Sequence, residues 1–144
     1  YMGLISEDYK FGKKAEIAVK PLLDEVFGPL LETDRVNKFH SFDFTNNNYY
    51  VEHKQRNCKY GQYPSLYFDY SKYEAYIKFK AIHPHIKFFI IWSCKNGHYY
   101  WQFNENENES YISRQTLNRT THLQTNHMLN IKNEFIFKLD NIKI

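Results

Sequence analysis

Apolar residues at three- and four-residue steps predict a helix near the start of the chain. Over residues 7–27 they form one apolar stripe, which is typical of an amphipathic helix packed on a core. Pro21 lies inside this range and either kinks the helix or begins a second one. Gly28 and Pro29 then predict its end. The stripe consists of Ala15, Ala18, Val19, Leu22, Leu23, Val26 and Phe27.

Beyond Asp34 the pattern changes to alternating apolar and polar residues, which predicts strands. Residues 39–45 and 49–56 alternate in this way on either side of the asparagine run 46–48. Because asparagine tolerates the backbone conformations of tight turns, the two segments predict a β-hairpin. Residues 65–69 predict a short third strand.

A second helix and a buried strand are expected next. Ser71 is a candidate N-cap, and Glu74 at the third helical position would complete a capping box, so the helix is expected to run through Lys80. Residues 87–94 are almost continuously apolar. Such a run is typical of a strand covered on both faces.

The remaining sequence has weaker signals. An Asn-Gly turn at residues 96–97 predicts a hairpin into residues 99–103. In the tail, we expect a short helix over residues 111–118 and two strands over residues 128–131 and 134–139.

The order of these elements predicts an α/β layer fold. A chain of 144 residues fits one domain, with a core of about residues 7–103 and a C-terminal extension of residues 104–144. Aromatic residues make up 19% of the chain, which excludes a disordered tail because so many rings offset the ordering entropy. No apolar run approaches the roughly 18 residues of a membrane span, and the first residues lack a signal-peptide pattern. An intracellular protein is therefore expected, in the cytoplasm or nucleus, which includes a viral or phage protein in a host cell.

The charge is mildly basic, with a formal net charge of +3. This value is compatible with a nucleic-acid partner but does not require one. Basic residues are concentrated in the first helix and around the second hairpin strand. They are Lys10, Lys13, Lys14 and Lys20, then Lys54, Arg56 and Lys59.

Candidate chemistry lies on the predicted hairpin. Asp43 is on its first strand, and Glu52, His53 and Lys54 are on the second. Because side chains alternate along a strand, Glu52 and Lys54 share one face while His53 points away. The tight turn brings Asp43 alongside Glu52. Two carboxylates beside a lysine suit a hard divalent cation and an anionic substrate.

Together with Glu16 on the upstream helix, these residues resemble the PD-(D/E)xK nuclease superfamily, which has the restriction-endonuclease-like fold. Asp43 is followed across the hairpin by Glu52-x-Lys54, and Phe42 stands where many members have a proline. The element order also resembles the αβββαβ core of that family, a mixed central sheet flanked by helices. The likeness covers roughly the first two-thirds of the chain.

The resemblance implies a metal-dependent endonuclease that hydrolyses phosphodiester bonds, in DNA rather than RNA by family habit. Asp43 and Glu52 would ligate Mg²⁺, or Mn²⁺ as a substitute, with the backbone carbonyl of His53 as a further ligand. Glu16 would reach the same cluster directly or through water. Lys54 would position the metal-activated water that acts as nucleophile and stabilise the charge that develops in the transition state.

Further residues are candidates for binding the substrate. Lys13, Arg56, Lys59 and Lys72 are candidates for phosphate contacts. Four tyrosines either stack on unpaired bases or cover a small core with their hydroxyls in water. These tyrosines are Tyr60, Tyr63, Tyr67 and Tyr70.

The resemblance also implies that the protein could form a homodimer, which pairs two sites to cut two strands.

Other functions remain open at this level. A non-catalytic nucleic-acid-binding module on the same fold would not need buried acids that repel phosphate. A protein-interaction module would explain the many tyrosines and the modest charge, and it predicts no stabilisation by metal. A cap-snatching-type RNA endonuclease is a third alternative, but that group usually separates its lysine further from the last acid.

Overall fold

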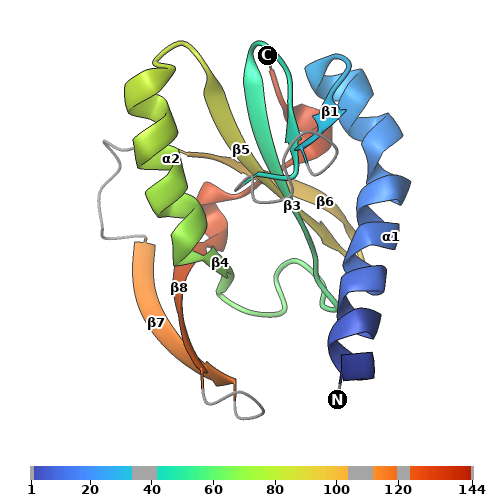
Figure 1. The fold of residues 1–144 in the computed structure, drawn as a ribbon, viewed down its shortest axis with the longest axis vertical. Coiled ribbons are helices and arrows are strands. Elements are labelled where there is room, and N and C mark those ends of the chain that lie inside the picture. Colours follow the sequence, from blue (N-terminus) through green and yellow to red (C-terminus); the bar gives the residue numbers. More distant parts are fainter. Residues whose placement is uncertain (1, 34–41, 104–111, 120–123, 144) are drawn as a thin grey trace.

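The computed structural model describes residues 2–33, 42–103, 112–119 and 124–143. Within them lie a main sheet of six strands, a second sheet of three strands and two long helices (Figure 1). Helix α1 (Met2–Phe27) covers one face of the main sheet, and helix α2 (Tyr70–Ile82) lies on the other side. An α/β fold with a mixed sheet is therefore confirmed. No helix in these ranges is both long and apolar enough to cross a membrane.

The main sheet has the strand order β1-β2-β3-β5-β6-β9. Only β3 and β5 pair in parallel, and each other neighbouring pair in this sheet is antiparallel. A parallel pair needs a crossover connection, and α2 lies within it. The strands are β1 (Leu31–Glu32), β2 (Phe44–Thr45), β3 (Tyr49–Gln55), β5 (Lys87–Cys94), β6 (Gly97–Gln102) and β9 (Phe137–Lys138).

The second sheet has the order β4-β8-β7 and is antiparallel throughout. Its strands are β4 (Ser65–Asp69), β7 (Ile112–Arg119) and β8 (Gln124–Lys132). The predicted short strand at residues 65–69 has the right bounds, but it joins this sheet instead of the main one. The place of the expected third strand in the main sheet is taken by β1, which the sequence did not predict. With only two residues, β1 is too short to show an alternating pattern.

Strand β5 is buried on both faces, as its apolar run predicts. Phe88, Ile90 and Trp92 belong to the hydrophobic cluster on the α2 side. Phe89 and Ile91 belong to the cluster on the α1 side. The strand therefore separates two cores, and the residues of both cores hold the neighbouring strand β3 in place.

Helix α1 is a single helix that contains Pro21. Its residues Val19, Leu23 and Phe27 are buried in the α1-side cluster, in agreement with the predicted stripe. The helix ends at Gly28, as predicted, where φ is 82°. Glycine adopts this left-handed conformation without the steric cost that a Cβ would add.

The predicted start of α2 is wrong. The helix begins at Tyr70 with Asp69 as its N-cap, so Ser71 lies within the first turn and the capping box with Glu74 does not form. Asp69 does not cap the helix with its side chain. Its carboxylate instead lies 3.5 Å from Nζ of Lys54.

The predicted helix at residues 111–118 is also wrong, because residues 112–119 form strand β7. Pairing with β8 along the whole length of β7 overrides the weak local preference. The predicted strand at residues 128–131 lies within β8, whereas the strand predicted at residues 134–139 is reduced to β9. Two 3-10 helices flank β9, η3 (Asn133–Phe135) and η4 (Leu139–Asn141).

The C-terminal extension is built into both cores. Strand β8 pairs with β4, and β9 extends the main sheet next to β6. Ile131 is fully buried in the α2-side cluster, and Leu139 is buried in the α1-side cluster. The core therefore does not end near residue 103.

The turn between β2 and β3 is organised by Asn46. Its Oδ1 accepts hydrogen bonds from the backbone N–H groups of Asn48 and Tyr49, both at 2.9 Å. Its Nδ2 donates to the carbonyl of Phe27 at 3.1 Å and so satisfies the end of α1. The turn sets the register in which Phe44 lies opposite Val51.

Replacing Asn46 by Ala is expected to lower the free energy of unfolding by about 2–4 kcal/mol, since four side-chain hydrogen bonds of about 0.5–1 kcal/mol each are lost, the fourth being the one that Nδ2 donates to the carbonyl of Pro29. Urea denaturation measures this change. Asn47→Ala is the matched control, because Asn47 is exposed in the same turn, and it should change the stability by less than about 0.5 kcal/mol. Equal losses in both variants would contradict the role of Asn46.

Candidate functional site

Asp43 immediately precedes β2, at the point beyond which β3 no longer pairs with β2. Strand β2 pairs with β3 only as far as Val51. One position further, Oδ2 of Asp43 accepts a hydrogen bond of 2.8 Å from the backbone N–H of His53. The carbonyl of Asp43 accepts another from the N–H of Thr33 at 3.0 Å. Continuing the register places Asp43 opposite Glu52, as the sequence predicts.

Glu52 is the most buried charged residue among those described, with 1% of its surface exposed. Its Oε2 lies 3.3 Å from Nζ of Lys54 and 3.6 Å from Nζ of Lys72. Its Oε1 is buried and accepts no hydrogen bond from an N–H or hydroxyl donor among the described residues, although Glu52 and Asp43 are close enough to share a hydrogen bond when one of the two carboxyls is protonated. A buried carboxylate oxygen without a donor is costly, so this atom marks a place where a cation or a proton is needed.

Glu16 reaches the same place from helix α1. It lies close enough to Asp43 for its charge to raise the pKa of that carboxyl. Lys13, one turn earlier, lies between Oε2 of Glu16 at 3.6 Å and Oε2 of Glu32 at 3.7 Å. The structure therefore brings together Glu16 from α1, Asp43 from the position before β2 and Glu52 from β3.

The carboxyls of this cluster hold their protons more tightly than usual. Burial, and then the charge of Glu16, raise the pKa of Asp43 to about 6, although the His53 N–H opposes the shift. Burial and repulsion from Asp43 raise the pKa of Glu52 to about 8, against the attraction of two lysines. A bound cation would remove this repulsion.

Lys54 is held in its charged form. Burial alone would lower the pKa of its ammonium group, but the carboxylates of Glu52, Asp69 and Asp43 raise it. Its Nζ lies 3.3 Å from Glu52 and 3.5 Å from Asp69. The ammonium is therefore fixed between two strands and remains a donor at neutral pH.

The carboxylates of Asp43 and Glu52 suit a hard cation whose remaining ligands are water molecules or substrate oxygens. Within the described ranges, no three His, Cys, Asp or Glu side chains are placed to hold a metal by themselves. Asp43 and Glu52 are two adjacent carboxylates, and one of them has an oxygen for which the described residues supply no N–H or hydroxyl donor. Mg²⁺ is commonly bound by one or two carboxylates and completes its shell with waters and substrate phosphate. Asp43 and Glu52 therefore have the oxygen donors that a hard cation such as Mg²⁺ prefers.

The side chain of His53 lies away from the carboxylates, as predicted. Its Nε2 lies 2.8 Å from Oγ of Ser93, which in turn lies 2.7 Å from Nδ1 of His98. Burial, followed by the charges of His98 and Lys54, lowers the pKa of His53 to about 4. The ring is therefore neutral at physiological pH, and only the backbone of His53 belongs to the candidate site.

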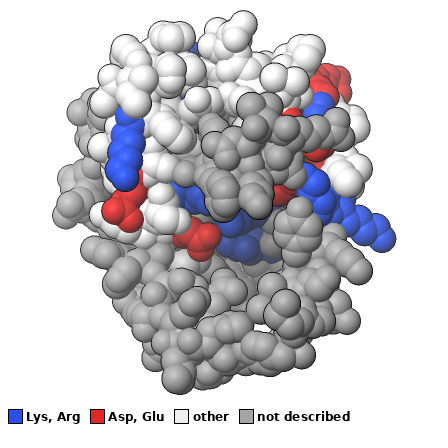
Figure 2. Space-filling view, in the orientation of Figure 1, with Lys and Arg blue, Asp and Glu red and all other residues white. Residues whose placement is uncertain are grey.

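The predicted phosphate-binding residues differ in their surroundings. Lys13 and Lys72 contact carboxylates of the cluster. Arg56 donates to the carbonyl of Tyr67 at 3.0 Å and lies over its ring, 4.7 Å from the ring centre. Lys59 is exposed in the loop after β3. Figure 2 shows that basic side chains gather near the centre of this face, between α1 and α2, with acidic side chains beside them.

Two further residues of the site were missed by sequence reasoning. Asp69 contacts Lys54, and Glu32 is buried on β1 beside Lys13. An acidic residue at the junction of a strand and a helix is typical of a helix cap, and Asp69 is indeed the N-cap residue of α2. Glu32 lies in a two-residue strand that has no sequence signal.

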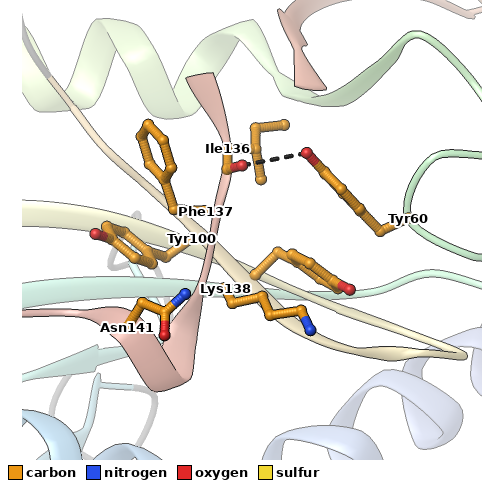
Figure 3. A pocket seen from close by; sticks show the side chains of 7 residues that line it. Tyr60, Tyr100, Ile136, Phe137, Lys138 and Asn141 are labelled. Carbon is orange, nitrogen blue, oxygen red and sulfur yellow. Dashed lines mark hydrogen bonds between the residues drawn. The ribbon is translucent and has the colours of Figure 1, made fainter. Parts of the chain in front are cut away.

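A separate cavity of about 350 Å³ lies at the opposite edge of the main sheet (Figure 3). Its described lining contains no acidic residue, so it is not part of the carboxylate cluster. Tyr60 does not present a free face there, because its ring stacks on Tyr99 with 4.2 Å between the ring centres. The hydroxyl of Tyr60 bonds the carbonyls of Asn133 and Ile136. The cavity is lined by Tyr60, Tyr99, Tyr100, Ile136, Phe137, Lys138 and Asn141.

The site as a whole combines carboxylates with lysines from several elements. Glu52 and Lys54 lie on β3, and Lys72 approaches from the first turn of α2. Such an arrangement is able to hold a hard cation and a polyanion next to each other. No protein-family model, curated protein or solved structure in our comparisons matches this chain.

Proposed function

We propose that the protein is a metal-dependent nuclease that hydrolyses phosphodiester bonds in nucleic acid, with DNA as the preferred substrate. The observation that carries this proposal is the buried carboxylate of Glu52, which lies beside Asp43 and two lysines and has one oxygen without an N–H or hydroxyl donor among the described residues. A structural role explains this arrangement poorly, because an apolar side chain would fill the same space without the cost of burying a polar carboxyl group that lacks a donor.

In this function Asp43 and Glu52 would hold Mg²⁺ or Mn²⁺, together with the backbone carbonyl of His53. The ion would supply a water of lowered pKa and polarise the phosphodiester. Glu16 would reach the cluster directly or through water. The ammonium of Lys54 would orient the attacking water and stabilise the negative charge that develops on the phosphate oxygens.

Lysines near the cluster bind the phosphates of the substrate. Lys72 lies 3.6 Å from Glu52, so its ammonium is close to the proposed position of the scissile phosphate. Lys13, Arg56 and Lys59 are proposed to contact flanking phosphates. A purely nucleic-acid-binding module would gain nothing from the buried acids, because they repel phosphate.

The element order supports a restriction-endonuclease-like core. Helix α1 is followed by the antiparallel strands β1, β2 and β3, then by α2 and by β5, which is parallel to β3. This is the helix, three strands, helix and strand order of that fold, provided that β4 is assigned to the second sheet. Asp43 and Glu52 then lie at the second and third strands of the series.

The direct test is cleavage of labelled DNA and RNA, single- and double-stranded, with Mg²⁺, with Mn²⁺ and with EDTA. We expect cleavage of DNA with either metal and none with EDTA. Titration calorimetry with Mn²⁺ in the presence of a DNA ligand measures metal binding independently of turnover. Absence of both cleavage and Mn²⁺ binding would contradict the proposal.

Lys72→Ala is expected to lower cleavage by about 10- to 100-fold, because one charge that faces the developing phosphate charge is lost. Single-turnover cleavage measures this loss. Lys78→Ala is a matched control on the same helix, since Lys78 is exposed and lies further from the start of α2. Equal cleavage rates for the two variants would show that Lys72 does not contribute to catalysis.

A further inference from the structure

The two cysteines of the chain are far apart in the sequence but are brought into the same part of the core. Cys58 lies in the loop between β3 and β4, and Cys94 is the last residue of β5. Cys94 is buried in the α2-side cluster, and the partly exposed Cys58 packs against that cluster. Both thiols are free.

Hydrogen bonds hold the loop of Cys58 against the end of β5. The backbone N–H of Lys95 donates to the carbonyl of Cys58 at 2.9 Å. Two residues beyond each cysteine, the N–H of Tyr60 donates to Oδ1 of Asn96 at 2.7 Å. Nδ2 of Asn96 donates back to the carbonyl of Tyr60 at 3.2 Å. The two segments are therefore fastened side by side at two points, with the cysteines at the first of them.

The side chains of Cys58 and Cys94 meet within this arrangement. Their thiols are close enough to hydrogen-bond to each other. Burial, followed by the charge of Cys58, raises the pKa of the Cys94 thiol to about 11. A disulfide needs Cα atoms roughly 4–7 Å apart, a spacing that neighbouring hydrogen-bonded segments supply. A bond between the two sulfurs therefore requires no large movement of the backbone.

We propose that Cys58 and Cys94 form an oxidative modification site, at which a small disulfide such as oxidised glutathione converts the two thiols into one intramolecular disulfide. The bond would join the loop that follows β3 to the end of β5. The inference is independent of the proposed function, because it involves neither a metal ion nor nucleic acid.

The exchange proceeds in two steps. The thiolate of Cys58, the more exposed cysteine, attacks one sulfur of oxidised glutathione, forms a mixed disulfide and releases one glutathione, which takes up a proton. The thiolate of Cys94 then attacks Sγ of Cys58, forms the Cys58–Cys94 bond and releases the second glutathione. The protein loses two electrons and two protons, and oxidised glutathione gains both as two thiols. Since Cys94 must lose its proton first, its raised pKa predicts that the second step accelerates as the pH rises.

The test is oxidation of the folded chain with oxidised glutathione, without metal or nucleic acid, followed by alkylation in denaturant and mass spectrometry. We expect a protein that is two hydrogen atoms lighter, carries neither an alkyl group nor glutathione, and yields one pair of tryptic peptides linked through residues 58 and 94. In a glutathione redox buffer, the ratio of disulfide to dithiol should be about 100-fold higher for the folded protein than for the chain unfolded in urea, because folding holds the thiols together.

Two single variants separate the steps. Cys94→Ala retains the more exposed thiol and should accumulate the mixed disulfide of Cys58 with glutathione. Cys58→Ser retains the buried thiol and should react with oxidised glutathione at least about 10-fold more slowly than Cys94→Ala. The oxidised wild type should also unfold at a higher urea concentration than the reduced wild type, since the cross-link restricts the unfolded chain.

Four results would overturn the proposal. Two alkylated cysteines after oxidation would show that the thiols do not react, and a wild type that stops at a glutathione adduct would show that Cys94 does not reach Cys58. Disulfide-linked dimers without the intramolecular bond, seen by non-reducing electrophoresis, would show that the cysteines pair between chains. Equal ratios of disulfide to dithiol in the folded and unfolded chains would show that the fold does not bring the thiols together.

Discussion

Replacing Asp43 by Asn is expected to lower metal-dependent cleavage of DNA by at least about 10³-fold, because a ligand contribution of several kcal/mol to the transition state is lost. The amide oxygen of the introduced asparagine is still able to accept the hydrogen bond that Oδ2 of Asp43 accepts from the N–H of His53. The variant should therefore fold with the same register of β2 and β3. Single-turnover cleavage with Mn²⁺ measures the rate.

Asp140→Asn is a matched control, since Asp140 is exposed in η4 and undergoes the same chemical change. Its rate should equal that of the wild type within about twofold. Calorimetry on Asp43→Asn should also show weakened Mn²⁺ binding. A variant that cleaves within about threefold of the wild type would place the catalytic centre elsewhere.

Replacing Glu52 by Gln is expected to abolish cleavage and, without metal, to stabilise the protein above neutral pH. In the folded protein, burial and repulsion from Asp43 raise the pKa of Glu52 from 4.5 to about 8. Between these two values the unfolded chain loses a proton that the folded chain retains. Wild-type stability therefore falls as the pH rises from about 4.5 to about 8, by a few kcal/mol when the shift is fully expressed.

Urea denaturation over this pH range distinguishes the two proteins. The free energy of unfolding of Glu52→Gln should lack the part of the decline that Glu52 contributes, which extends to about pH 8, and should keep only the part up to about pH 6 that the raised pKa of Asp43 contributes, so the two curves should diverge with rising pH. Glu74→Gln, an exposed position on α2, should follow the wild type. Parallel stability curves for the wild type and Glu52→Gln would show that folding does not raise the pKa of Glu52.

Metal should reverse this order of stability. A ligand that binds only the folded protein stabilises it by about 2.7 kcal/mol at about one hundred times its dissociation constant. Mn²⁺ is therefore expected to raise the thermal midpoint of the wild type at pH values near 8 and to leave Glu52→Gln unchanged. The same shift in both proteins would place the Mn²⁺ site away from Glu52.

Local sequence patterns were sufficient to predict those parts of the structure in which residues contact others that are close to them in the sequence. The apolar stripe of α1, the asparagine turn and the buried strand β5 all lie where the sequence predicts them. The proximity of Asp43 to Glu52 follows from the turn between them, and the shared face of Glu52 and Lys54 follows from strand alternation. These residues are separated by few positions, so periodicity and turn chemistry determine their arrangement.

Long-range pairing decided the rest. The sequence by itself determined an α/β fold and a carboxylate pair with a lysine. Only the tertiary structure brought Lys72 and Asp69 to this pair and held Arg56 at Tyr67. It also assigned β4 to a second sheet and turned a predicted helix into β7. The physical reason is that these contacts depend on which strand is the neighbour, and short or polar segments acquire their structure from that neighbour and not from their own periodicity.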